Sequence, residues 1–293
     1  RRRHSPRSNQ TSRSLRQRCP RGLSSAWYAG RMDAWNSIGD VATTFALGND
    51  QRVALERYAE LVLAWRAANI TAVRGKADVA RLLVGEALSL LDVPELRTRG
   101  ADTWLDLGSG GGVPGLPLAV VMPSVSMTLL DATSRKCAFL REAVVAADVS
   151  SRTRVVCARS EHYAAMGSPG REAFSVVIAR AVAPLSVLVE LAAPLVRPGG
   201  VLAASKTGHA ASVEVPEAGC AATVCGFGSP VVRTLPRSPL SDAVCVVYEK
   251  VRTTRADIPR RAGMATKRPL GDSHGPSPTA GSATIVAAAK GGR

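Results

Sequence analysis

The stretch Leu105-Asp106-Leu107-Gly108-Ser109-Gly110-Gly111-Gly112-Val113-Pro114-Gly115 decides the fold class of this chain. It joins a short apolar strand to a glycine-rich turn, and a helical pattern follows the turn. Glycines there permit positive φ angles and let a ligand approach the main chain closely. Pro114 suits the first turn of the following helix, where its missing N–H would have no intrahelical partner. A ligand can therefore sit against the start of that helix.

The segments after this turn alternate between strand and helix patterns. Expected strands cover 104–107, 127–130, 154–157, 175–178 and 201–204, with two further β-rich stretches around Thr223 and Val244; expected helices cover 135–147 and 184–195. Upstream, apolar residues at helical spacing predict helices over 50–68 and 77–91. The alternation predicts an α/β fold of the Rossmann-like kind, with a mainly parallel seven-stranded sheet, helices on both faces and a short helical N-terminal extension.

The formal charge of +15 is concentrated at the two ends of the chain. Residues 1–40 carry a net +7 and residues 252–293 a net +6, which leaves only +2 for 41–251. Any affinity of the central part for nucleic acid must therefore come from a local patch. Both ends have too few periodic apolar residues to form a core, which predicts disordered tails over 1–40 and 253–293. The domain between them covers 41–252, with helices over 50–92 and the Rossmann-like core over 101–251.

Met32 can serve as an initiator, so one hypothesis is that the residues before it are absent from the native protein, which an intact-mass measurement tests.

The six cysteines form no CxxC pair and the histidines do not cluster, so neither a zinc site nor a disulfide framework is indicated. No stretch approaches the ~18 apolar residues of a membrane span. The arginine-rich start lacks the apolar segment of a secretory signal. These features predict a cytoplasmic protein without a membrane partner, and we expect a monomer.

Two carboxylates flank the glycine-rich turn. Gly110, Gly112 and Gly115 fit the GxGxxG pattern, which NAD(P) and FAD domains share. Asp106 stands where a dinucleotide fold prefers an apolar residue, and it can hold the cationic amino-acid end of a methyl donor. Asp131 ends the next strand and can accept hydrogen bonds from both ribose hydroxyls. The pair predicts an S-adenosylmethionine site; a purely structural turn and an NAD(P) oxidoreductase are the weaker alternatives.

Five segments together resemble one family. Asp106–Pro117 resembles the glycine-rich motif of the RsmG (GidB) family of 16S rRNA (guanine-N(7))-methyltransferases, whose paired prolines are unusual among methyltransferases. Further likenesses, in the family's order, are Asn69–Arg74, Leu129–Arg141, Arg159–Glu161 and Ala179–Ala183. The resemblance spans about 45–250. It departs from the family after the first helix, where Glu86 alone keeps the acidic character, and at Ser205-Lys206-Thr207.

The resemblance implies a set of donor contacts. Gly108 and Val113 would contact S-adenosylmethionine with Gly110 in the same turn, Ser160 and Glu161 would bracket its adenine, and Arg180 would line the same pocket. A surface guanidinium at Arg180 and an ordinary helix-start carboxylate at Glu161 are the structural alternatives.

The resemblance also implies the acceptor. The family methylates nitrogen 7 of a guanine in the 530 loop of 16S rRNA, in the 30S subunit or an assembly intermediate. That nitrogen carries no proton, so we nominate no catalytic acid or base. Four cations near strand ends form the predicted RNA-binding patch: Arg135, Lys136, Arg141 and Lys206. A different acceptor, protein or small molecule, and a non-catalytic ribosome-binding protein on the same scaffold remain open.

Overall fold

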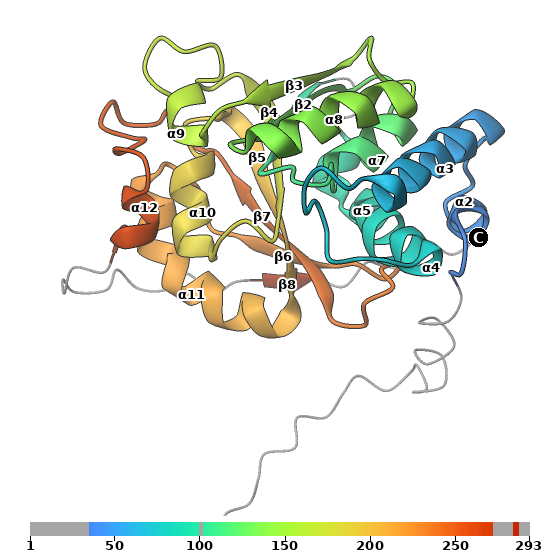
Figure 1. Cartoon of the computed structure of the whole chain (residues 1–293). Coiled ribbons are helices and arrows are strands. Elements are labelled where there is room, and N and C mark those ends of the chain that lie inside the picture. The colour runs from blue at the N-terminus through green and yellow to red at the C-terminus, as the bar shows by residue number, and fades with distance from the viewer. Residues whose placement is uncertain (1–34, 100–101, 272–283, 287–293) are drawn as a thin grey trace, which may run out of the picture.

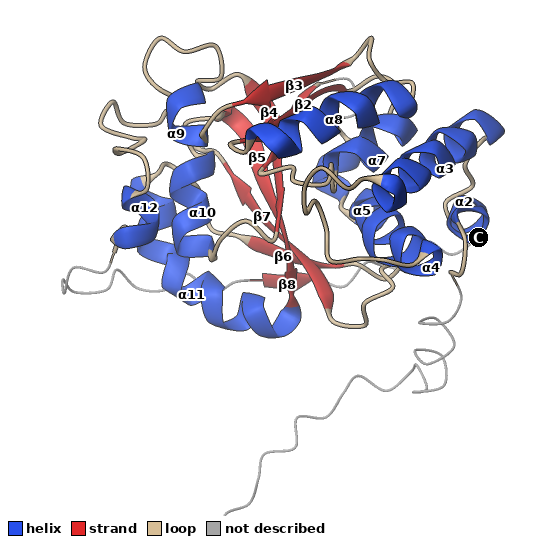
Figure 2. Ribbon diagram, viewed as in Figure 1, coloured by secondary structure: helices blue, strands red, loops and turns tan. Residues whose placement is uncertain are grey.

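The computed structural model describes residues 35–99, 102–271 and 284–286 (Figures 1 and 2). Its centre is one sheet with the strand order β3-β2-β1-β4-β5-β7-β6-β8. The strands are β1 Thr103–Leu107, β2 Ser126–Asp131, β3 Thr153–Cys157, β4 Phe174–Arg180, β5 Val196–Thr207, β6 Val231–Thr234, β7 Ala243–Glu249 and β8 Thr284–Val286. The first five pair in parallel, β7 runs antiparallel to β5 and β6, and β8 is parallel to β6.

Helices cover both faces of the sheet (Figure 1). One face carries α2 Ile38–Thr44, α3 Asn49–Ala64, α4 Lys76–Asp78, a π-helix Val79–Gly85, α5 Glu86–Ser89, α7 Gly115–Val121 and α8 Ser134–Ala146. The other carries α9 Ser160–Tyr163, α10 Leu185–Ala192, α11 Gly208–Val224 and α12 Met264–Lys267. A 3₁₀ turn Leu90–Asp92 and α6 Pro94–Arg97 lead into β1. The predicted α/β class is confirmed, and β8 adds a strand to the seven expected.

Alternate side chains of the strands divide the interior into two apolar cores. In β1, Trp104 packs beneath the α3, α7 and α8 layer, while Leu105 and Leu107 pack beneath α10 and α11. This alternation follows from the two-residue period of a strand. A sheet that is buried on both faces leaves only its strand ends and loops for ligands.

The predicted strand around Thr223 is wrong. Thr223 lies in α11, where its hydroxyl donates to the Gly219 carbonyl, and the sixth strand begins at Val231. The apolar run that suggested a strand is the alanine-rich buried face of that helix, which includes Ala218 and Ala222. Packing of small side chains against the domain stabilised a helix there, although the flanking residues locally favour a strand.

The predicted boundary at residue 253 is also wrong for 253–271, which fold back onto the domain. Ile258 is buried, and Arg171 donates to the carbonyls of Thr254 and Ile258. Arg260 forms a two-bonded ion pair with the buried Glu190, at 2.7 and 2.6 Å. Charge-assisted contacts and isolated buried side chains such as Ile258, rather than a periodic apolar pattern, hold this segment, so its composition did not reveal it.

The domain also starts earlier than predicted, because the buried Trp35 and Ile38 precede residue 41. The expected disorder over 1–34, 272–283 and 287–293 falls outside the described residues. Within the described ranges, no helix combines the length and apolar character that a membrane span requires.

Candidate functional site

The glycine-rich turn after β1 adopts a main-chain conformation that favours glycine. Gly108, Gly110 and Gly112 have φ angles of 73°, 54° and 86°. The N–H groups of Gly108 and Ser109 donate to the Leu130 carbonyl at 2.8 and 3.0 Å, which anchors the turn to β2. A Cβ atom on Gly108 would lie 2.9 Å from a methyl group of Val182. The turn is therefore pressed between β2 and the segment after β4, without room for side chains at Gly108.

Asp106 is a fully buried carboxylate beneath this turn. One oxygen, Oδ2, accepts the Gly115 N–H at 2.9 Å, while Oδ1 is buried and has no hydrogen-bond partner among the described residues. Burial raises the pKa of Asp106 to about 7, although the Gly115 hydrogen bond favours the ionised form. A buried oxygen without a partner is costly. A cationic ammonium group would satisfy it, so this position fits the amino-acid end of S-adenosylmethionine.

Asp131 sits at the end of β2 and reaches the same turn. Its Oδ2 accepts the Gly110 N–H at 2.9 Å and its Oδ1 accepts the Thr133 N–H at 2.8 Å. Each oxygen of an ionised carboxylate can accept a second hydrogen bond. Main-chain donors therefore orient Asp131 and leave it able to accept further hydrogen bonds, and its contact with the ribose hydroxyls stays a prediction.

Arg180, at the end of β4, forms an ion pair with Glu86 at 3.0 Å and donates to the Leu82 carbonyl at 2.8 Å. Burial raises the pKa of Glu86, and the Arg180 charge opposes that rise. The next residue, Ala181, has a φ of 54°, an uncommon conformation for a residue with a side chain. No sequence pattern linked Arg180 to Glu86, whereas the structure pairs their side chains. The adjoining π-helix over 79–85 is a type of distortion common at functional sites.

Ser160 and Glu161 lie at the start of α9, after β3. The Ser160 hydroxyl donates to one oxygen of Glu161 at 3.1 Å, and the other oxygen accepts the Gly263 N–H at 2.9 Å. Burial opposes ionisation of Glu161, but the hydrogen bonds from Gly263 and Ser160 outweigh it and lower the pKa. The folded C-terminal segment thus orients a residue of the expected adenine side. No sequence signal pointed to Gly263.

The remaining predicted residues are Val113 and the four cations of the predicted RNA-binding patch. Val113 is partly buried and packs against the core under α7. On α8, Arg135 and Arg141 are exposed and Lys136 is half-buried, so all three are available to a ligand. Lys206 differs, because its ammonium group contacts Glu214 at 2.7 Å and the Ala183 carbonyl at 2.9 Å. Its charge is compensated within the fold, which the predicted RNA contact did not anticipate.

The parallel sheet, the glycine-rich turn and the two carboxylates at neighbouring strand ends define a class I S-adenosylmethionine-dependent methyltransferase. The sequence profile of GidB, rRNA small subunit methyltransferase G, matches residues 51–236. The chain belongs to this family.

Three relatives carry the name ribosomal RNA small subunit methyltransferase G. The one from Rubrobacter xylanophilus is 35% identical over 244 residues, which cover 82% of this chain and 88% of the relative. The one from Roseiflexus castenholzii is 36% identical, covering 78% of this chain and 97% of the relative. The one from Alkaliphilus oremlandii is 32% identical, covering 74% and 89%.

Proposed function

We propose that this chain transfers the methyl group of S-adenosylmethionine to nitrogen 7 of a guanine in the 530 loop of 16S ribosomal RNA. The single observation that carries the donor side is Asp106, a buried carboxylate with one unpaired oxygen beneath the glycine-rich turn. The acceptor side is supported by membership of a family named for methylation of small-subunit rRNA.

The reaction requires the protein to position the two substrates, and it requires no proton transfer by a side chain. S-adenosylmethionine supplies an electrophilic methyl group on a cationic sulfonium. Guanine nitrogen 7 attacks with an in-plane lone pair that carries no proton, so no general base is needed. Holding the reacting atoms about 3 Å apart and in line supplies several kcal/mol toward the barrier.

Each site residue then has a binding or orienting role. Asp106 holds the donor's ammonium group, Asp131 holds the ribose, and the Gly108 main chain borders the donor closely. Ser160 and Glu161 border the adenine. Arg180, fixed by Glu86, positions the segment after β4 that faces Gly108.

The first test is transfer of tritium from labelled S-adenosylmethionine to 30S subunits that lack this methylation, followed by nucleoside analysis. Label in 7-methylguanosine that disappears with Gly108→Arg is the expected result. Donor binding without labelling of ribosomal RNA would favour another acceptor. Absence of donor binding would leave a ribosome-binding protein without catalysis. Deproteinised 16S rRNA, assayed in parallel, distinguishes naked RNA from the particle as substrate.

We further propose that the chain acts as a monomer in the cytoplasm, on 30S subunits or their assembly intermediates. Light scattering of the purified protein, alone and with donor, tests the monomeric state. A stable dimer would contradict it.

A further inference from the structure

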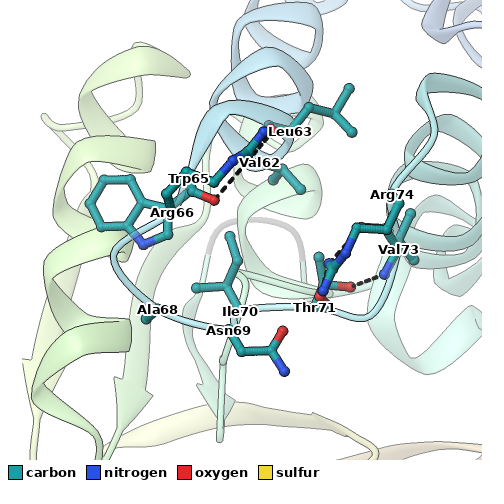
Figure 3. A pocket seen from close by; sticks show the side chains of 10 residues that line it. All are labelled: Val62, Leu63, Trp65, Arg66, Ala68, Asn69, Ile70, Thr71, Val73 and Arg74. Carbon is teal, nitrogen blue, oxygen red and sulfur yellow. Dashed lines mark hydrogen bonds between the residues drawn. The ribbon is translucent and has the colours of Figure 1, made fainter.

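A pocket of about 470 Å³ lies in the loop between α3 and α4 (Figure 3). Its wall is apolar, with Val62, Trp65 and Ile70, and its rim carries Arg66, Asn69 and Arg74. None of these residues belongs to the donor site described above.

The loop that forms the pocket packs against the glycine-rich turn. The Tyr58 hydroxyl donates to the Gly111 carbonyl at 2.7 Å, which fixes α3 against the turn. A Cβ atom on Gly111 would lie 3.1 Å from the Ile70 carbonyl, so the pocket loop touches the turn itself. The neighbouring Gly110 donates to Asp131. The loop that lines the pocket therefore packs against the turn proposed to bind the donor.

The rim of the pocket is cationic and preorganised. Residues 65–76 contain Arg66, Arg74 and Lys76 but no acidic residue. Arg66 donates to the carbonyls of Leu63 and Trp65 at 2.6 and 3.0 Å, and Arg74 repeats the pattern with Thr71 and Val73 at 2.6 and 3.1 Å. Figure 3 shows the two guanidinium groups well apart, that of Arg66 beside Leu63 and that of Arg74 beside Thr71.

Those contacts use one terminal nitrogen of each guanidinium. Within 35–99, 102–271 and 284–286, neither Arg66 nor Arg74 forms an ion pair with a carboxylate. Each therefore keeps donors and its full charge for an anion. An arginine whose side chain is already held loses less conformational entropy when it binds a phosphate.

The apolar wall connects the pocket to α8. The Trp65 ring packs edge-on against Phe139 of α8, with ring centres 5.3 Å apart. The Trp65 indole N–H is buried and has no hydrogen-bond partner among the described residues. Since α8 also carries the exposed Arg135 and the half-buried Lys136, a chain of phosphates could reach from the pocket to this helix.

We propose that this pocket binds one unstacked nucleotide of the RNA substrate, with its base against the apolar wall and its flanking phosphates on Arg66 and Arg74. The inference rests on the proposed function and names a subsite for it. Single-stranded RNA is held by apolar or aromatic surfaces for bases and by cations for phosphates, and the pocket offers both. The donor itself is cationic, so this rim repels it. The cationic rim and the buried carboxylates therefore direct the two substrates to different places.

The test is the double variant Arg66→Ala/Arg74→Ala, with Arg97→Ala as the matched control. Arg97 is exposed in α6, just before the amino end of β1, and it lies outside the pocket. Binding of a fluorescein-labelled RNA hairpin with an unpaired guanine is measured by anisotropy over a range of salt concentrations. For each variant, steady-state kinetics with 30S subunits and the dissociation constant of the donor are also measured.

We expect the double variant to bind the hairpin roughly 10- to 100-fold more weakly than wild type. Its salt slope should be shallower by about 1.4, since each phosphate contact to a single strand contributes about 0.7. KM for 30S should rise while the donor dissociation constant stays within about twofold. Arg66→Lys/Arg74→Lys should recover part of the RNA affinity, because a lysine still binds phosphate as a point charge.

Hairpin affinity equal to that of Arg97→Ala would overturn the inference. Loss of donor affinity with normal hairpin binding would also overturn it, because the loop would then serve the donor site. If wild type labels 30S and the double variant does so equally well, the inference fails while the proposed function stands. If wild type labels no RNA, the proposed function fails, and the hairpin titration still decides whether the pocket binds RNA. Should the alanine variant unfold, the lysine variant and Asn69→Ala are compared in the same titration.

Discussion

Two neighbouring loops differ in how their conformation is fixed and in the charge they present. The glycine-rich turn over 108–112 is anchored by the Leu130 carbonyl, carries no charge of its own and lies against the carboxylates of Asp106 and Asp131. The loop over 65–75 touches this turn, but it is held by its own arginines and presents their charge to solvent. On the proposed function, the cationic donor and the polyanionic RNA bind to these two loops and are distinguished by charge.

The largest expected effect comes from Gly108→Arg in the glycine-rich turn. Arginine must adopt the positive φ of 73°, and its Cβ would meet Val182 at 2.9 Å. We expect donor affinity to fall by more than about 100-fold, with loss of methyl transfer. Gly219→Arg is the control, because a Cβ there meets nothing within 4 Å. Calorimetry of donor binding measures the effect, and circular dichroism checks the fold. Normal donor affinity in Gly108→Arg would remove the turn from the donor site.

Asp106→Asn tests the buried carboxylate with the shape nearly unchanged. The asparagine oxygen can still accept the Gly115 N–H, but the charge opposite the donor's ammonium group is lost. A hydrogen bond to a charged group is worth about 1.5–3 kcal/mol, so donor affinity should fall roughly 10- to 150-fold. Hairpin affinity should stay unchanged. An equal loss of both affinities would mean that the variant damages the fold rather than the site.

Because of Asp106, donor affinity and the stability of the fold should change with pH in opposite directions. The pKa of Asp106 is about 7 in the free protein, so the ionised form that suits the donor declines below pH 7. Donor affinity should weaken by up to about tenfold per pH unit from 7 to 5.5. Because this folded-state pKa is raised, the contribution of Asp106 to stability is present at low pH and is lost as pH rises from about 4 to 7. Both slopes should vanish in Asp106→Asn, measured by calorimetry and urea denaturation. A wild-type protein without either slope would contradict the prediction.

A smaller effect is expected where β4 meets the N-terminal helices. Arg180→Met leaves the partly buried Glu86 without its cation, which should cost about 1–3 kcal/mol of unfolding free energy. Donor affinity should fall about tenfold, because the Arg180 charge also favours the ionised form of Asp106. Arg180→Met/Glu86→Gln should regain part of the stability but not the donor affinity. If the stability losses of the two single substitutions simply add in the double variant, the two residues are not coupled.

The smallest effect is expected on α8, where Arg135 and Lys136 have exposed or half-buried side chains. Arg135→Ala/Lys136→Ala should weaken hairpin binding about 3- to 10-fold at moderate salt, with a salt slope shallower by up to about 1.4. Donor affinity should not change. If donor affinity falls instead, these residues belong to the donor pocket or the fold, and the donor and the RNA are not bound by separate sets of residues.

The sequence predicted most of the core correctly because apolar runs and helical spacing are local patterns. Short apolar runs located β1 to β4 within about two positions and the central part of β5, and helical patterns located α8 and α10. Thr223 was misplaced because an alanine-rich helix and a short strand look alike over a few residues. The segment over 253–271 was missed because its order depends on single ion pairs, such as Arg260 with Glu190, that have no local signature.

The sequence by itself predicted the candidate donor site: the glycines that need positive φ, and the carboxylates of Asp106 and Asp131 at the ends of strands. Those features are local, since they depend on main-chain conformation and on a residue's place at the end of a strand. Only the tertiary structure joined Arg180 to Glu86, tied Glu161 to Gly263, neutralised Lys206 and set the loop of Arg66 and Arg74 against the turn. These contacts join segments far apart in the chain, and they depend on how the two layers of helices pack onto the sheet.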